Sequence, residues 1–139
     1  MGIVQYMPLS GIINAQRVFK TRHFDRWMRK TELTNGALCA AVREMSQGLI
    51  DADLGHGLVK KRVGLAGRGK RSGARTLVAT NKNNRWLFVF GFEKNERTNI
   101  DADELDVWQN LAAELLLRSS DELAIAVIDG ALKEICHEH

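Results

Sequence analysis

The chain has 139 residues, of which 45% are hydrophobic and 27% are charged. This size and balance predict one compact globular domain and exclude a disordered tail, a collagen-like repeat and a coiled-coil rod. No apolar run approaches the roughly 18–20 residues that a membrane helix needs, so we expect no membrane-spanning segment. The two cysteines lie far apart in the chain and do not favour a disulfide-stapled secreted domain.

The N-terminal residues carry no sign of a targeting segment. Residues 1–16 contain no Lys or Arg before a hydrophobic stretch, and Tyr6 replaces the Ser or Thr of a myristoylation motif. We interpret residues 1–16 as a short N-terminal extension, with Met7 as an alternative start, and we expect a cytoplasmic protein.

Positive charge is concentrated in the middle of the chain. Residues 54–92 contain nine Lys and Arg side chains and no Asp or Glu, whereas residues 98–139 contain ten acidic and two basic side chains. The basic stretch is expected to attract a polyanion, or the acidic C-terminal part of the same chain. Because basic clusters of this kind are the electrostatic footprint of nucleic-acid binding, we favour an anion site over a solvated strand face.

In chain order, the first expected elements are a short strand at 17–20 and two helices. The spacing of apolar residues predicts amphipathic helices over 22–33 and 36–50, separated by Asn35-Gly36. Cys39 lies near the apolar stripe of the second helix and is interpreted as a small core residue.

The pattern then changes to period two. In residues 58–65 apolar side chains occupy odd positions and Lys60 and Arg62 even ones, which predicts a strand with one buried and one cationic face. Lys61 is an exception on the apolar side. A loop is expected over 66–73, followed by a β-hairpin over 75–92. Four aromatic residues at period two are expected to share one buried face of its last strand: Trp86, Phe88, Phe90 and Phe92.

Two helices are expected after residue 100. Asp101 with Glu104 and Ser119 with Glu122 fit capping boxes, and the apolar residues of the second helix extend to Ile135. The order β-α-α-β-β-β-α-α predicts an α+β domain, a small antiparallel-rich sheet flanked by an N-terminal helix pair and C-terminal helices. We interpret the acidic side chains of the last helices as solvated surface; the alternative is that they screen the cationic face.

Three further patterns are rejected as ligand sites. Gly64-x4-Gly69-Lys70 imitates a phosphate-binding loop, but Arg71 replaces the Ser or Thr that reaches magnesium, and a strand follows instead of a helix. Gly67-x-Gly69 opens like a dinucleotide fingerprint without its following helix. Cys136-His137-x-His139 lies at the chain end and is interpreted as an exposed tail. We therefore expect neither a metal nor another cofactor.

The arrangement that we retain is a group of cations on neighbouring strands. Lys60 and Arg62 point the same way from one strand, Arg75 opens the next, and Lys94 and Arg97 follow the last one. Guanidinium groups placed together would stabilise the five-coordinate phosphorus that forms when a 2′-OH attacks a phosphodiester.

Repulsion from its cationic neighbours disfavours the protonated form of Lys60, which makes it the candidate general base. We expect a catalytic group of five residues: Lys60, Arg62, Arg75, Lys94 and Arg97. Four more cations are expected to bind RNA: Lys61, Arg68, Lys70 and Arg71.

These residues carry a resemblance to a known family. The chain resembles the RelE superfamily, in particular the HigB/RelE-like toxins of bacterial type II toxin–antitoxin pairs. The runs that carry the likeness occur in the family's order: Val18-Phe19-Lys20-Thr21, Gly57-Leu58-Val59-Lys60-Lys61-Arg62-Val63, Gly73-Ala74-Arg75-Thr76-Leu77 and Phe88-Val89-Phe90-Gly91-Phe92-Glu93-Lys94-Asn95-Glu96-Arg97. The likeness implies a RelE-like toxin domain over 17–117, with residues 118–139 as an acidic helix or tail packed on it.

The resemblance also implies a function and partners. It implies ribosome-dependent cleavage of mRNA, a cytoplasmic location, and neutralisation by a partner antitoxin, often a helix-turn-helix protein. By position, Lys60 and Arg62 match the family's basic strand pair and Arg75 its transition-state arginine. Lys94 and Arg97 match its basic segment after the last strand.

Two positions depart from the family's pattern. Asn95 stands where RelE itself has a catalytic arginine, and the tyrosine acid of some members has no counterpart, since Asp101 falls near its place. The leaving-group acid is therefore unassigned, with His56 or a lysine as candidates.

Two other functions stay open. One is a non-enzymatic binder like the ParE-type members of the superfamily, which act on DNA gyrase; intact RNA together with inhibited supercoiling would favour it. The other is a relative that binds RNA without cutting it, in which case salt would weaken binding steeply and no product would form.

Overall fold

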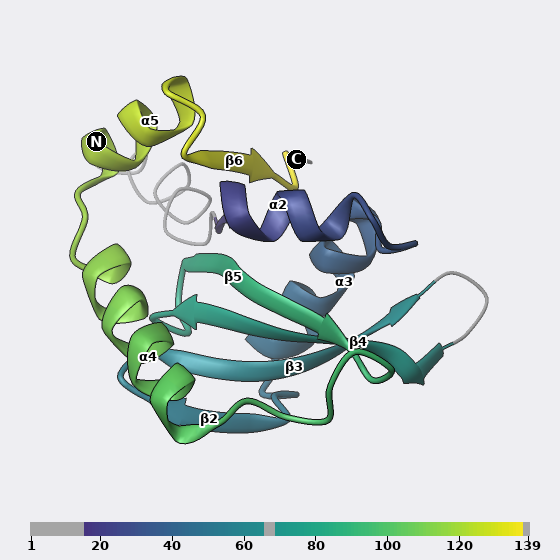
Figure 1. Ribbon diagram of the computed structural model, residues 1–139. Helices are drawn as coiled ribbons and strands as arrows, with labels where there is room; N and C mark the ends of the chain where they lie inside the picture. The colour runs from purple at the N-terminus through teal and green to yellow at the C-terminus, as the bar shows by residue number, and fades with distance from the viewer. Residues whose placement is uncertain (1–15, 66–68, 138–139) are drawn as a thin grey trace.

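A six-stranded sheet forms the centre of the molecule in the computed structural model (Figure 1). The structure describes residues 16–65 and 69–137, and for residues 69–72 it describes the backbone alone. The strands are β1 (Arg17–Thr21), β2 (Ala52–Gly55), β3 (Leu58–Leu65), β4 (Gly69–Thr80), β5 (Arg85–Glu93) and β6 (Leu132–Ile135). The helices are α2 (Arg22–Met28), α3 (Asn35–Ser46), α4 (Ala102–Leu116) and α5 (Ser120–Ile128). The strand order is β2-β3-β4-β5-β1-β6, and only the β1–β5 pair is parallel. The predicted α+β class, with helices flanking a small sheet, is confirmed.

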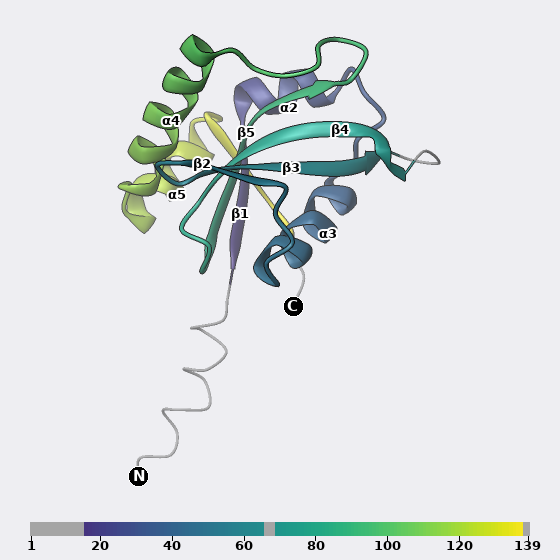
Figure 2. The same cartoon turned by 90° about the horizontal axis from the view of Figure 1, so that it is seen from below.

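Helices cover both faces of this sheet. Figure 2 shows α3 and α4 on opposite sides of it. On one face α2 and α3 pack on side chains of all the long strands, in a core that includes Phe24, Leu38, Val42, Val59 and Trp86. On the other face α4 and α5 pack on a second core, which includes Phe19, Leu58, Leu77, Ala112 and Leu123. Because successive side chains of a strand point to opposite faces of the sheet, the position of a residue in its strand decides which pair of helices its side chain packs against.

Both predicted capping boxes are present. In α4 the Asp101 side chain accepts a hydrogen bond from Glu104 N at 2.9 Å, and the Glu104 side chain accepts one from Asp101 N at 3.1 Å. Ser119 and Glu122 form the same reciprocal pair at the start of α5. These bonds satisfy backbone donors that the first helical turn leaves unpaired.

The N-terminal helices are shorter than the predicted ranges 22–33 and 36–50. α2 ends at Met28 because the Met28 carbonyl accepts hydrogen bonds from both the backbone N–H and the hydroxyl of Thr31, which closes a turn there. Asn35-Gly36 opens α3 rather than separating the helices, since Thr34 caps that helix by accepting a bond from Ala37 N at 3.1 Å.

The four aromatic residues of β5 do not share one face, contrary to the prediction. Trp86 and Phe88 pack in the α2–α3 core, whereas Phe90 packs against the α4–α5 core. The pairing with β4 explains the switch, because Leu77 pairs with Phe90 and Val78 with Phe88, which leaves Val89 as an extra residue. A bulge of this kind reverses the side-chain alternation beyond it.

Three strand predictions also need correction. No element is predicted from the sequence for residues 51–55, whereas the structure has β2 there. β4 begins at Gly69, so most of the predicted loop 66–73 is strand; residues 66–68 lie outside the described part of the chain. Ile135 belongs to β6 and not to a helix, since Gly130 with φ +82° lets the chain reverse after α5 and pair antiparallel with β1.

The two cysteines form a disulfide that the sequence analysis did not predict. Cys39 in α3 is bonded to Cys136 just after β6, with a Cα–Cα distance of 5.7 Å and a sequence separation of 97. Cys136 is therefore anchored to the helix layer rather than part of a free tail. Within the described residues, no helix has the length and apolar character needed to cross a membrane.

Candidate functional site

A cationic cavity of about 320 Å³ lies on the α4 side of the sheet, at the end of β5. It is lined by Asp51, Lys60, Arg62, Arg75, Phe92, Thr98 and Asn99. β3 contributes Lys60 and Arg62 from alternate positions, β4 contributes Arg75, and the connection from β5 to α4 closes one side. Three of the five predicted catalytic residues therefore meet at one place.

Arg62 and Arg75 are direct cross-strand partners in the β3–β4 pair. Like charges directly opposite each other destabilise a sheet, so this pairing is unfavourable for folding alone. An anion bound between the two guanidinium groups would remove that repulsion. Asp51 offsets part of this repulsion through its ion pair with Arg62, and a bound anion would offset more of it.

Asp51 is a member of this site that the sequence analysis missed. Its carboxylate accepts a hydrogen bond from the backbone N–H of Arg62 at 2.7 Å and one from Arg62 Nε at 3.3 Å. The backbone N–H of Asp51 donates to the carbonyl of Lys60 at 3.0 Å. The sequence signal for this residue is the acidic run Asp51-Ala52-Asp53 before β3. That run points to the site only when β2 is known to pair with β3.

Arg75 has no carboxylate partner among the described residues. Its Nη1 donates a hydrogen bond to the carbonyl of Gly73 at 3.3 Å, and its side chain is half-buried. Asp51 offsets one of the three cations that line the cavity, so the site keeps a net positive charge. A partly buried guanidinium that is not neutralised interacts strongly with a ligand phosphate.

The structure places Lys94 and Arg97 outside this cavity. Lys94 is exposed in the connection after β5, and Arg97 forms a bidentate ion pair with Glu104, with Nη1–Oε distances of 2.8 and 2.7 Å. The hydrogen bond to Glu104 raises the pKa of Arg97, and the bond from Arg97 lowers the pKa of Glu104. Arg97 lines a neighbouring cavity instead.

Of the predicted RNA-binding residues, Lys61 is the one whose side chain is described, and it lies away from the catalytic group. Lys61 is 4% exposed on the opposite face of β3, where its Nζ lies 2.9 Å from the Glu44 carboxylate and donates to the carbonyl of Leu49. Arg68 lies outside the described residues, and for Lys70 and Arg71 only the strand backbone is described.

The candidate acid His56 is exposed in the turn between β2 and β3, with φ +58°, and does not line the cavity. Asp101, near the place of the family's tyrosine, is occupied as the N-cap of α4. In the part of the chain that the structure describes, no three His, Cys, Asp or Glu side chains are grouped so as to hold a metal ion.

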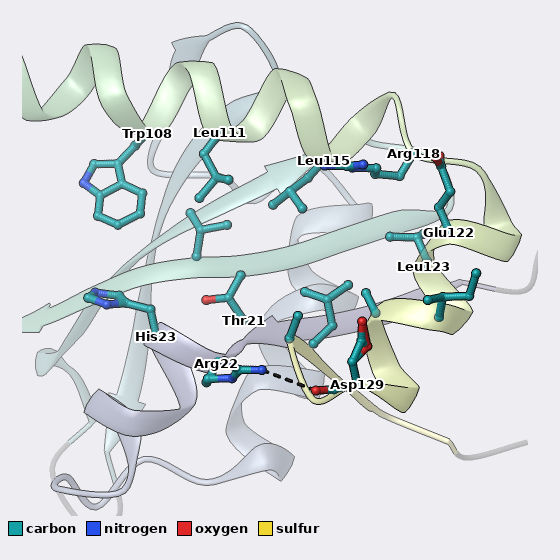
Figure 3. A pocket seen from close by; sticks show the side chains of 15 residues that line it. Thr21, Arg22, His23, Trp108, Leu111, Leu115, Arg118, Glu122, Leu123 and Asp129 are labelled. Atoms are coloured by element: carbon teal, nitrogen blue, oxygen red, sulfur yellow. Dashed lines mark hydrogen bonds between the residues drawn. The ribbon is translucent and has the colours of Figure 1, made fainter.

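A larger and mostly apolar groove of about 530 Å³ lies between α4, α5 and the sheet. Figure 3 shows Leu111 and Leu115 of α4 facing Leu123 of α5, with Trp108 and His23 at the far end. None of the predicted site residues lines it, so it is separate from the cationic cavity.

Most of the chain matches a known protein family. Residues 16–135 match the family model described as the RelE toxin of the RelE/RelB toxin–antitoxin system. The chain belongs to the RelE toxin family. This confirms the resemblance found in the sequence, and membership implies an antitoxin partner. A search of curated proteins finds no match.

Proposed function

We propose that this RelE-family protein is a cytoplasmic toxin that cleaves mRNA on the ribosome, with the 2′-OH of the RNA as nucleophile and without a metal ion. The observation that supports this most is the cavity lined by Lys60, Arg62 and Arg75, with Asp51 as its one carboxylate. Such a site suits a phosphate that gains negative charge during the reaction.

In the proposed reaction, the 2′ oxygen forms a bond to phosphorus while Lys60 takes up its proton as the general base. Arg62 and Arg75 stabilise the five-coordinate phosphorus, and Asp51 acts as a positioning residue for Arg62. The bond from phosphorus to the 5′ oxygen then breaks, and that oxygen takes up a proton from solvent water, since no side chain is assigned as the acid. The products are a 2′,3′-cyclic phosphate and a 5′-OH end.

The other predicted cations have lesser roles in this proposal. Lys94 is exposed in the connection after β5, and in this proposal it contacts the RNA backbone, together with Arg68, Lys70 and Arg71. Lys61 is left out of the proposed RNA contacts, because its amine is held by Glu44 on the opposite face. The proposed protein partner is a helix-turn-helix antitoxin.

The test compares wild type with Arg75→Ala in growing bacteria and in a translation reaction. Wild type should arrest growth and cut mRNA during translation, leaving 5′-OH ends. Loss of one transition-state donor should slow cleavage by about 100-fold or more. Lys82→Asn is the matched control, because it removes an exposed cation at the opposite end of the β4–β5 hairpin and should cleave like wild type.

The proposal is wrong if wild type does not arrest growth, or if Arg75→Ala arrests growth equally well. Intact mRNA with inhibited DNA supercoiling would assign a gyrase-binding function instead. RNA binding that weakens steeply with salt but yields no product would assign a binding function alone. Co-expression of a helix-turn-helix protein encoded beside the toxin should restore growth.

A further inference from the structure

A second cavity of about 340 Å³ lies at the exposed edge of β5, next to the cationic cavity. β1 pairs with β5 only as far as Phe88, and α2 lies beside the rest of that edge. Phe92 lines both cavities, so the two cavities are neighbours. One extended ligand is therefore a candidate occupant of both.

The walls of this second cavity are aromatic and held in place. The half-buried indole of Trp27 lies against β5 at Gly91, where a Cβ atom would overlap the ring. Trp27 Nε1 donates a hydrogen bond to Glu96 at 3.2 Å, and its ring meets Phe24 edge-on at 5.4 Å. Phe90 lines the cavity as well. The indole is thus fixed before any ligand arrives.

Cations surround these aromatic walls. Arg26 and Lys30 are exposed residues of the cavity lining, and among the described residues neither forms an ion pair. The guanidinium of Arg97 lies 5.9 Å from the ring centres of both Phe90 and Phe92. Glu96 is the one acidic residue of the lining, and it is engaged by Trp27 and by the backbone N–H of Glu93.

Aromatic walls with cations around them are the chemistry that binds an unpaired nucleobase and its phosphate. We propose that the Trp27 cavity receives the nucleobase adjacent to the cleaved phosphodiester, with Arg26 and Lys30 near the phosphate that follows. This inference rests on the proposed function and adds a base-binding subsite to it. An acidic peptide would also suit the cations, but it would not require the aromatic wall.

The test measures binding of a short single-stranded RNA whose riboses carry 2′-O-methyl groups, so that it cannot be cleaved. Trp27→Leu should weaken binding about fivefold or more, the lower end of the effect of losing one stacked base. Two further RNAs each carry one abasic position, on either side of the central phosphate. Wild type should bind one of these two abasic RNAs as weakly as Trp27→Leu binds the intact RNA. Trp27→Leu should bind that same abasic RNA little more weakly still, because the stacked base and the indole act as a pair.

Two controls separate this inference from folding effects and from the proposed function. Arg26→Ala with Lys30→Ala alters exposed side chains only and should also weaken binding and reduce its salt dependence, whereas Lys82→Asn should not. Unchanged binding by Trp27→Leu, together with weakened binding by Arg75→Ala, would overturn the base subsite and leave the nuclease proposal standing. No RNA binding by wild type would overturn the base subsite, whereas the nuclease proposal is decided by cleavage during translation. Binding of an acidic peptide in place of RNA would assign the cavity to a protein partner.

Discussion

Lys60 and Lys61 are neighbours in the chain but belong to different parts of the molecule. Alternation along β3 directs Lys60 into the cationic cavity and Lys61 into the layer beneath α3, where Glu44 and the carbonyl of Leu49 hold its amine. The same residue type therefore has a proposed chemical role at one position and a structural role at the next.

Single alanine substitutions should separate these two roles. Lys60→Ala should lower the cleavage rate by at least 100-fold with little change in the unfolding temperature, because a general base is lost from the surface of a cavity. Lys61→Ala should lower stability by about 2 kcal/mol, less than for a fully buried pair because Glu44 is partly exposed. Cleavage kinetics and thermal unfolding measure the two effects, and the same phenotype for both variants would contradict the assignment.

Asp25 carries a pH-dependent part of the stability. It is 4% exposed, and its carboxylate lies 2.7 Å from Lys20 Nζ, 2.5 Å from Arg29 Nη2 and 3.0 Å from Lys133 Nζ. Burial alone would raise the pKa of Asp25, but the hydrogen bonds from Lys20, Lys133 and Arg29 together lower it well below its ordinary value of 3.8. The ionised form is thus the one that the fold stabilises.

Because folding lowers the pKa of Asp25, its ionised carboxylate stabilises the fold fully above about pH 4. This stabilisation is lost as the pH falls towards the pKa that Asp25 has in the folded protein. Asp25→Asn should lower the free energy of unfolding at pH 7 by about 3 kcal/mol, since it leaves the buried Lys20 amine without its counter-charge. The difference from wild type should shrink below pH 4. Urea unfolding at several pH values measures this, and a difference that stays constant down to pH 2 would contradict it.

At the scale of elements, the start of α4 has a structural role. Asp101 falls near the position of a catalytic tyrosine in some family members, but its side chain caps the helix through Glu104 N. Asp101→Ala should lower stability by about 1 kcal/mol, and Asp101→Asn should restore most of it, because both Asp and Asn cap helices well. Neither variant should change the cleavage rate of the folded protein. A cleavage defect in Asp101→Asn with normal stability would make Asp101 part of the chemistry.

At the scale of the whole molecule, the disulfide links two distant parts of the chain. Cys39 lies in α3 and Cys136 follows β6, so reduction frees the C-terminal strand from the helix layer. Closing a loop of this length should contribute about 3–5 kcal/mol, mainly by restricting the unfolded chain.

Thermal unfolding with and without a thiol reductant should therefore show a lower midpoint for the reduced wild-type protein. The variant Cys39→Ser with Cys136→Ser should unfold at that lower midpoint under both conditions. If reductant also lowered the midpoint of the double variant, the effect on wild type would not come from this bond.

Local sequence patterns by themselves determined the α+β class, the course of β3, the turn between β4 and β5, and both capping boxes, because each depends on neighbours a few residues apart. The sequence also placed Lys60, Arg62 and Arg75 on neighbouring strands, but the direct pairing of Arg62 with Arg75 came from the structure. The bulge that divides the aromatic residues of β5, the strands β2 and β6, and the Cys39–Cys136 bond depended on partners far away in the chain. Tertiary structure alone could bring Asp51 to Arg62 and place Trp27 beside the cationic cavity, since those contacts arise only when separate strands and helices pack together.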